Sequence, residues 1–237
     1  MDVLVQTNNL TKRYGQHKVV NNVNLSVKKG EIYGLIGRNG AGKTTVLRLI
    51  SGLASPTEGE ICLFGHSSHD TIYVQNRVGI LIENPGIYPN MSARENVKLK
   101  CLAKGISNKS YITELLESVG LRAANKKKVK HFSVRMKQRL GIALALAGNP
   151  ELVILDEPIN GLDPQGITEI REIITELNRD KNITFIISSH ILGELSKIAT
   201  CYGIIEKGEL KKQIMRAELT EDLEEYFLNL MGGVSND

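Results

Sequence analysis

A glycine-rich segment, GRNGAGKTT from Gly37 to Thr45, directly follows the apolar run Ile32 to Ile36. Its position between a predicted strand and a predicted helix is typical of a loop that binds phosphate. Glycines allow backbone conformations that a Cβ would block, so that N–H groups can surround phosphate oxygens at the positive end of a helix. Lys43 is expected to reach the β- and γ-phosphates, and the Thr44 hydroxyl to bind Mg²⁺. The segment therefore predicts a nucleoside triphosphate site.

Two carboxylates, Asp156 and Glu157, follow a second apolar run, Leu152 to Leu155. Ligand crevices of open α/β sheets form at the carboxyl ends of the strands. Asp156 is suited to hold Mg²⁺, and Glu157 is suited to orient and deprotonate an attacking water. Strands often end in Asp or Glu, so this pattern alone is weak. Combined with the glycine-rich loop, it predicts hydrolysis of the triphosphate.

A histidine follows a third apolar run, because His190 comes after Ile183 to Ile187 and two serines. Its imidazole is suited to donate a hydrogen bond to the γ-phosphate as charge builds up there during bond cleavage. A lone histidine is more often structural than catalytic, so both interpretations stay open.

The elements that must position these residues are of two kinds. Short β-like runs separated by turns predict an antiparallel sheet near the start of the chain: Leu4 to Leu10, Val19 to Val27, and Glu60 to Phe64. Other apolar runs are spread along the chain, alternate with helical patterns and predict a parallel sheet covered by helices: Ile32 to Ile36, Val78 to Ile82, Leu152 to Leu155, and Ile183 to Ile187.

Helical patterns replace strand patterns between Pro85 and Pro150, which predicts an inserted helical subdomain. Ser92 and Glu95 form a capping box ahead of its first helix. We therefore expect a nucleotide-binding core with an antiparallel β-subdomain in residues 1–86 and 146–217. The helical subdomain occupies residues 87–145, and a C-terminal helix and tail occupy residues 218–237.

The composition of the 237 residues, 41% of them hydrophobic, is that of a globular chain with a sizeable core. No apolar stretch reaches the roughly 18 residues that a membrane span needs, and no signal peptide is expected. The net charge of +4 is too small to imply nucleic-acid binding. One basic cluster, formed by Lys126, Lys127, Lys128 and Lys130, is interpreted as a solvated face rather than an anion or membrane-surface site.

In their order and spacing, these motifs resemble the ATP-binding subunit of an ABC transporter over essentially the whole chain. The glycine-rich loop resembles the Walker A motif of that family, Asp156 and Glu157 its Walker B pair, and His190 its switch histidine. The resemblance implies a P-loop NTPase of the ABC type, with a mostly parallel sheet core, an N-terminal antiparallel β-subdomain and an inserted helical subdomain. It also implies ATP and Mg²⁺ as the bound groups.

The resemblance implies further nucleotide contacts. Those of the Walker A loop are Gly37, Asn39, Gly40, Ala41, Gly42, Lys43, Thr44 and Thr45. Tyr14 resembles the aromatic residue that stacks on adenine, although a packed surface tyrosine remains the alternative. Asp163 ends a segment, Gly161 to Asp163, that resembles the D-loop. Asp163 and Pro164 are also expected to supply the N-cap and the first-turn proline of the helix that follows. Ser133 lies in Phe132 to Met136, which takes the place of the LSGGQ signature.

In that family the signature of one subunit closes over ATP held by another, in a head-to-tail dimer. By resemblance, we expect a homodimer or a heterodimer, and a separate membrane permease that docks on the helical subdomain and the segment near Glu83. The resemblance thus implies a cytoplasmic protein that is peripheral on the inner face of the cell membrane. ATP binding closes the dimer and hydrolysis reopens it.

Two positions depart from the common pattern of the family. Glu83 stands where many members carry glutamine, in a segment that resembles exporters of the bacitracin and lantibiotic resistance branch, and it is a third candidate ligand for Mg²⁺. Val134 and Arg135 replace both glycines of the signature. Arg135 is expected either to contact phosphate as a cation or to obstruct closure. We favour altered closure, in which case Arg135→Gly raises ATPase activity.

The sequence leaves one alternative function open, an ABC-type ATPase or ATP-binding module with a mechanical or regulatory role outside transport. Mechanical relatives usually insert a long coiled coil between the Walker A and signature motifs, or carry two nucleotide modules in one chain. This sequence shows neither feature. Export of a peptide antibiotic through a permease is therefore the favoured expectation.

Overall fold

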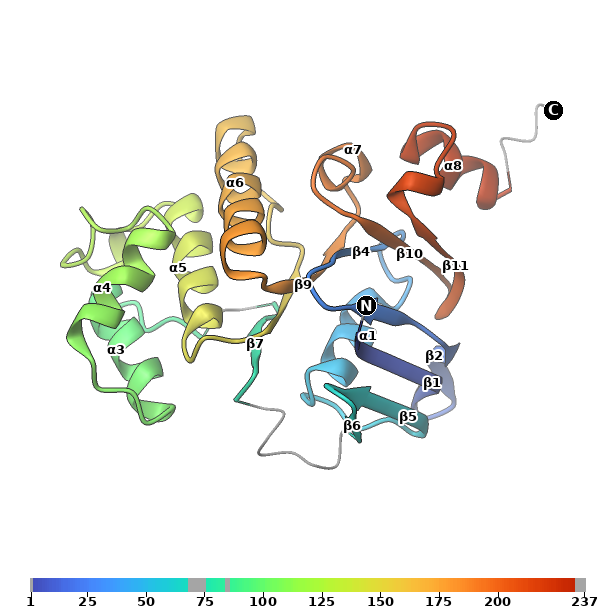
Figure 1. Cartoon of the computed structure of the whole chain (residues 1–237), viewed down its shortest axis with the longest axis horizontal. Helices are drawn as coiled ribbons and strands as arrows, with labels where there is room; N and C mark the ends of the chain where they lie inside the picture. The colour runs from blue at the N-terminus through green and yellow to red at the C-terminus, as the bar shows by residue number, and fades with distance from the viewer. Residues whose placement is uncertain (1, 68–75, 84–85, 233–237) are drawn as a thin grey trace. The chain divides into compact units, whose positions relative to one another are not determined.

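A computed structural model describes residues 2–67, 76–83 and 86–232 (Figure 1). The chain forms two compact units. The first unit consists of Met1–His69 and Ile186–Asp237, and the second unit of Asp70–Phe185. Pro85, where the helical patterns are predicted to begin, lies outside the described residues.

The first unit is rich in β-structure. Its strands are β1 (Val3–Tyr14), β2 (His17–Val23), β3 (Ser26–Lys28), β4 (Ile32–Ile36), β5 (Glu58–Leu63), β6 (His66–Ser67), β10 (Cys201–Glu206) and β11 (Glu209–Met215). Its helices are α1 (Lys43–Ile50), α7 (Leu192–Leu195) and α8 (Leu223–Leu230), with the short 3-10 helix η2 (Arg216–Glu218). Strand β9 (Thr184–Ser189) begins in the second unit and ends in the first.

Strand β1 is the centre of an antiparallel sheet, because it pairs with β2, β3 and β5. This confirms the antiparallel arrangement that the sequence predicts. The prediction of one strand from Val19 to Val27 is wrong, since β2 and β3 are separate. Between them, the Thr7 hydroxyl donates to Val23 O at 2.9 Å and accepts from Leu25 N at 3.0 Å. These side-chain bonds replace ladder bonds where the strand is interrupted.

Strand β4 leads into the glycine-rich loop and is buried along its whole length. It pairs in parallel with β10, which forms a hairpin with β11. A strand buried on both faces reads as a continuous apolar run, as Ile32–Ile36 does. The loop that follows is thus anchored on one side by a rigid, buried element, and α1 begins on its other side.

The second unit contains the predicted helical segment. Its elements are β7 (Val78–Leu81), α3 (Ala93–Ala103), α4 (Lys109–Ser118), η1 (Val129–His131), α5 (Val134–Leu146), β8 (Leu152–Asp156) and α6 (Pro164–Lys181). Strands β7 and β8 pair in parallel, with Leu81 opposite Leu155. Helices α3, α4 and α5 pack against one another, as Figure 1 also shows. No helix among the described residues has the length and apolarity that crossing a membrane demands.

Two of the predicted helix starts are confirmed in atomic detail. The Ser92 hydroxyl accepts from the Glu95 N–H, and the Glu95 carboxylate accepts from the Ser92 N–H at 2.7 Å, which completes the capping box. Asp163 caps α6 by accepting from Gly166 N at 3.1 Å, with Pro164 in the first turn. Polar side chains therefore satisfy backbone donors that a helix start leaves without partners.

Removal of the Ser92 cap tests its contribution to stability. Ser92→Ala should lower the free energy of unfolding by about 1 kcal/mol, because Ser92 caps α3 and is only 7% exposed. Hydrogen bonds from the Ser92 backbone and hydroxyl lower the pKa of the Glu95 carboxyl. The difference between the variant and the wild type should therefore shrink as the pH falls through this lowered pKa.

Urea unfolding at neutral and acidic pH measures the effect of Ser92→Ala. Ser107→Ala, an equivalent change at an exposed residue between α3 and α4, is the matched control and should leave the unfolding midpoint unchanged. Equal midpoints for the two variants at neutral pH would contradict the assigned role of the cap.

Candidate functional site

The glycine-rich loop folds around its own lysine. Lys43 is the first residue of α1 and is only 6% exposed. Its Nζ donates to Gly37 O at 2.7 Å and lies 3.4 Å from Arg38 O. A buried ammonium needs hydrogen-bond acceptors, and the loop carbonyls provide them. The loop therefore curves around the lysine, as the sequence predicts for a phosphate-binding loop.

The start of α1 is suited to an anion. Its N-cap is Gly42, with φ 105°, and no side chain caps the helix. No acidic residue lies in the first turn, where Thr44 and Thr45 are half-buried. The positive end of the helix dipole is thus not neutralised by a carboxylate of this helix. Ala41, which is buried, fixes the loop from outside by accepting from Gly208 N at 2.9 Å.

His190 shares a pocket with the glycine-rich loop in the first unit. The pocket has a volume of 240 Å³ and is lined by Ile36, Gly37, Arg38, Asn39, His190, Leu192 and Phe227. His190 itself is exposed, whereas Ser188 and Ser189 before it are buried. The structure thus brings together the switch histidine and two predicted loop contacts, Gly37 and Asn39.

Two residues of this pocket, Leu192 and Phe227, are missed by the sequence analysis. Phe227 belongs to α8 and is 8% exposed. The Glu224 carboxylate accepts from Gly193 N at 3.1 Å, which ties α8 to α7 directly after the histidine. The apolar stripe of the C-terminal helix shows that Phe227 packs against other residues. A stripe does not show which part of the protein the helix packs on, so it could not place Phe227 in this pocket.

Tyr14 ends β1 and is 48% exposed. The Lys12 ammonium lies 5.2 Å from the centroid of its ring. The same ammonium donates to Ser55 O at 2.6 Å. The ring is half-exposed with a lysine ammonium over it, and its stacking on adenine stays a prediction.

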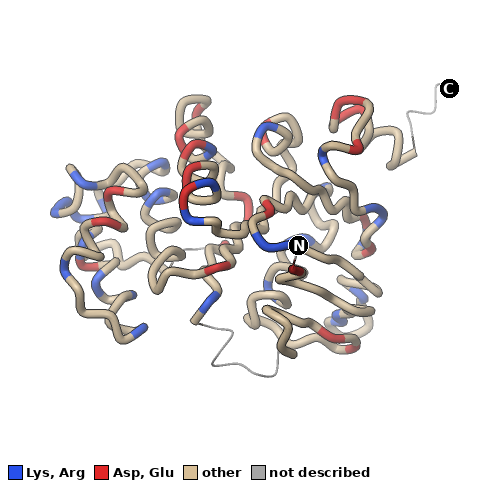
Figure 2. Tube along the Cα trace, in the orientation of Figure 1, with Lys and Arg blue, Asp and Glu red and all other residues tan. Residues whose placement is uncertain are grey.

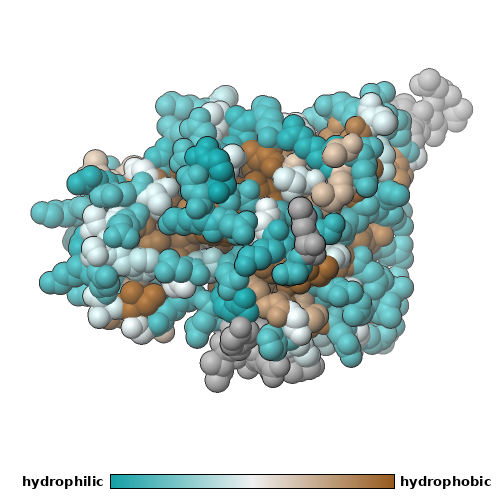
Figure 3. Space-filling view, viewed as in Figure 1, coloured by the Kyte–Doolittle hydropathy of each residue, from teal (hydrophilic) through white to brown (hydrophobic). Residues whose placement is uncertain are grey.

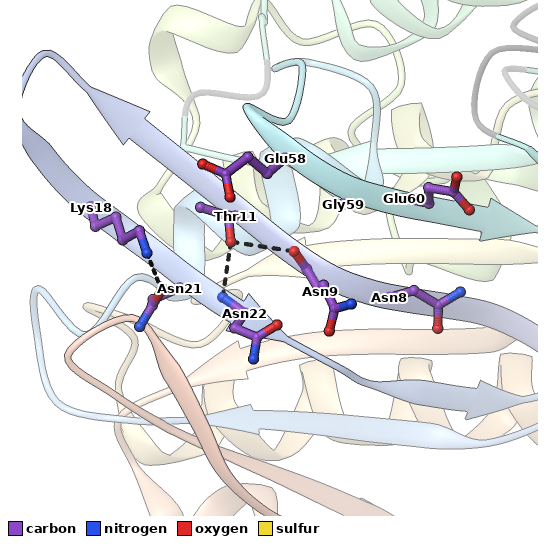
Figure 4. Close-up of a pocket in the computed structure, with 9 residues that line it drawn as sticks. All are labelled: Asn8, Asn9, Thr11, Lys18, Asn21, Asn22, Glu58, Gly59 and Glu60. Carbon is purple, nitrogen blue, oxygen red and sulfur yellow. Dashed lines mark hydrogen bonds between the residues drawn. The ribbon is translucent and has the colours of Figure 1, made fainter.

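A separate hollow of 680 Å³ lies on the antiparallel sheet of the first unit (Figure 4). It is lined by Asn8, Asn9, Thr11, Lys18, Asn21, Asn22, Glu58, Gly59 and Glu60. Thr11 and Asn21 link parts of its wall through hydrogen bonds to Asn22 N and Lys18 Nζ. None of the lining residues is a predicted nucleotide contact, and most are exposed. We assign this larger hollow no role in the phosphate chemistry.

The candidate acidic residues of the second unit follow two paired strands. Because Leu81 pairs with Leu155, Glu83 and Glu157 both lie two positions beyond a matched pair. Both adopt the left-handed region, with φ 57° at Glu83 and φ 49° at Glu157. Asp156 is half-buried at the end of β8. Non-glycine residues with positive φ are uncommon and often lie at functional sites, and the catalytic and metal-binding roles of these carboxylates stay predictions.

Ser133 caps α5, as its predicted position at a helix start requires. Its Oγ accepts from Met136 N at 3.2 Å, so the hydroxyl proton can still be donated to a ligand. The helix carries no acidic residue in its first turn, and Val134 is 59% exposed. This end of α5 is therefore accessible and electrostatically suited to a phosphate group.

Arg135 does not project freely from α5. Its guanidinium donates to Asp163 Oδ2 at 2.5 Å and to Glu169 Oε1 at 3.2 Å. The Gly166 N–H and then the Arg135 side chain lower the pKa of the Asp163 carboxyl. The structure thus brings together two signature and D-loop residues, Arg135 and Asp163, within the second unit.

Comparisons with known proteins agree with the motifs. The family described as ABC transporter matches residues 20–160. The chain is 49% identical to the bacitracin transport ATP-binding protein BcrA of Bacillus licheniformis, over 90% of this chain and 70% of that protein. It is 45% identical to the lantibiotic transport ATP-binding protein SrtF of Streptococcus pyogenes, over 95% of this chain and 96% of that protein.

A solved structure shares the fold. The dimeric post-hydrolysis state of the ATP-binding cassette MJ0796, bound to ADP and Pi, matches with a TM-score of 0.82 and 26% identity. The match covers 90% of this chain and 99% of that chain. Motifs, fold and relatives agree, and the chain therefore belongs to the ABC transporter family, as one of its ATP-hydrolysing ATP-binding subunits.

Proposed function

We propose that this protein powers the export of a peptide antibiotic of the bacitracin or lantibiotic type through a separate membrane permease. The single observation that carries the proposal is the identity of 45% to 49% with BcrA and SrtF, which extends over at least 90% of this chain. BcrA is a bacitracin transport protein, and SrtF is a lantibiotic transport protein. The segment at Glu83, which resembles the same branch, supports the proposal independently.

The proposed chemistry is hydrolysis of the β–γ phosphate bond of ATP. Lys43 exchanges part of its bonding to loop carbonyls for bonding to phosphate oxygens, and the start of α1, which no side chain caps, adds backbone donors. Glu157 orients a water in line with the γ-phosphate and accepts its proton. His190 donates to the γ-phosphate as negative charge develops there. The left-handed backbone at Glu157, directly after the end of β8, supports this assignment, because strained residues often lie at functional sites.

The donor set proposed for Mg²⁺ consists of the Thr44 hydroxyl and the Asp156 and Glu83 carboxylates. These are hard oxygen ligands, which this ion prefers. Thr44 and Asp156 are only half-buried, and Glu83 is exposed, so each can be reached by a hydrated ion. When bound, Mg²⁺ would neutralise charge on the β- and γ-phosphates.

We infer that two such subunits, identical or related, bind ATP between them. Ser133 and the start of α5 contact the γ-phosphate of the nucleotide that the partner's loop holds, and Asp163 contributes from its segment. The dimeric assembly of MJ0796 supports this arrangement. ATP then links two weakly paired surfaces, and hydrolysis removes the link.

The charge of the helical part of the second unit supports a location of the protein on a permease at the inner membrane surface. Its acidic residues between positions 87 and 145 are Glu95, Glu114 and Glu117. The exposed basic residues of the same segment that precede α5 are Lys98, Lys100, Lys109, Arg122, Lys126, Lys127, Lys128 and Lys130. Figure 2 shows more Lys and Arg than Asp and Glu along α3, whereas α4 carries both signs of charge.

Exposed apolar side chains accompany the positive charge. Tyr88, Leu99 and Leu102 are 55%, 40% and 49% exposed, and the two leucines lie one turn apart on α3. Figure 3 shows apolar atoms at the surface among mainly hydrophilic ones. A basic surface with exposed leucines is suited to an apolar permease segment close to anionic lipid headgroups.

Replacing the proposed base tests the reaction and the assembly together. Glu157→Gln should bind ATP but hydrolyse it at least about a hundredfold more slowly, since general base catalysis contributes about that much. The variant should therefore accumulate as an ATP-bound dimer, as size-exclusion chromatography with light scattering can measure. The same variant with ADP is the control and should stay monomeric. A monomer in saturating ATP would contradict the shared nucleotide site.

Reconstitution with a permease tests transport. ATPase activity of this protein in proteoliposomes should rise several-fold when a candidate permease is present, and rise further with bacitracin or a lantibiotic. Leu99→Asp with Leu102→Asp should abolish the stimulation without changing the activity of the isolated protein. Wild-type activity that does not respond to the permease would instead favour the mechanical or regulatory alternative.

A further inference from the structure

Arg135 is part of a chain of alternating charges between α5 and α6. Its guanidinium contacts Asp163 and Glu169, and Glu169 also accepts from Arg139 one turn further along α5. The side chains of Arg135, Glu169 and Arg139 are 27%, 23% and 18% exposed. Partly buried ion pairs that share partners are less screened than isolated surface pairs. This arrangement thus fixes the guanidinium at a defined place.

Gly166 makes room for the arginine. A Cβ on this residue would lie 3.1 Å from Arg135 Nε and 3.4 Å from Arg135 Cγ. It would also lie 2.8 Å from Asp163 Oδ1. The Arg135 side chain therefore crosses the first turn of α6 at its one residue without a side chain. The Arg135 side chain extends toward the backbone of α6 and does not cover the exposed start of α5.

The two oxygens of Asp163 have different partners. Oδ1 accepts from Gly166 N at 3.1 Å and caps α6, while Oδ2 accepts from Arg135 at 2.5 Å. A carboxylate held at both oxygens has one preferred orientation. Asp163 is the last residue of the segment that links Glu157 to α6. The orientation of its carboxylate therefore fixes how this segment enters the helix.

We propose that Arg135 is a positioning residue, which couples the first turn of the signature helix α5 to the Asp163 cap of α6 so that both are presented to a nucleotide as one rigid unit. The arginine does not act as a contact to phosphate. An arginine can replace a signature glycine here because its side chain extends toward Asp163 and Glu169. Ser133 and the backbone N–H groups at the start of α5 thereby stay accessible.

This interpretation and the obstruction that the sequence suggests predict opposite results. If Arg135 obstructs closure, its removal raises ATPase activity. If it positions Asp163, its removal lowers turnover and loosens the cap. The inference depends on the ATPase activity of the chain and not on the exported compound, so its failure is distinguishable from failure of the proposed transport function.

The test compares Arg135→Ala, Arg135→Lys and the control Lys137→Ala in the purified protein. Lys137 is exposed on the same helix, and the described residues show no ion pair for it. Arg135→Ala should lower kcat roughly fivefold, as loss of one partly exposed charged contact predicts, with KM for ATP within about twofold. Arg135→Lys should recover part of the loss, because an ammonium can still reach one carboxylate.

Amide hydrogen exchange provides a readout that does not depend on catalysis. Exchange at Gly166 N–H, which Asp163 caps, should accelerate in Arg135→Ala, less in Arg135→Lys, and not in Lys137→Ala. Arg135→Lys keeps the test decisive if the alanine variant does not fold. Turnover that rises on loss of the guanidinium, or exchange at Gly166 equal to that of the wild type, would overturn the proposal.

Discussion

The buried ammonium of Lys43 shapes the first half of the site. A charge with 6% exposure is tolerated only when acceptors surround it, and the Gly37 carbonyl, 2.7 Å away, is one of them. The loop must therefore curve back toward the start of α1. The start of α1, which no side chain caps, follows this loop, and helix N-termini attract anions. The buried β4 before the loop keeps this geometry rigid.

The sequence predicts those parts of the fold whose causes are local. The capping box at Ser92 and the Asp163 cap depend on residues within three positions of each other, and both are confirmed. The division of Val19 to Val27 into β2 and β3 was not predicted, because it depends on Thr7, a residue far away in the sequence. Propensity alone cannot show such a contact.

The same distinction applies to the site. Motif spacing locates the Lys43 loop and the Asp156–Glu157 pair, since each motif is contiguous. The partners of Arg135 are 28 and 34 positions away, and their contact depends on the absence of a side chain at Gly166. Phe227 likewise reaches the pocket of His190 from the C-terminal helix. Contacts of this kind follow from packing, which no short pattern encodes.

The left-handed backbone at Glu83 and Glu157 has an evolutionary consequence. A carboxylate side chain in this conformation costs roughly 1–3 kcal/mol relative to glycine or asparagine, which tolerate it better. Selection for thermal robustness alone would thus replace both glutamates. Under the roles proposed for them, Glu157 as the base and Glu83 as a magnesium ligand, keeping the two carboxylates sacrifices conformational stability for activity.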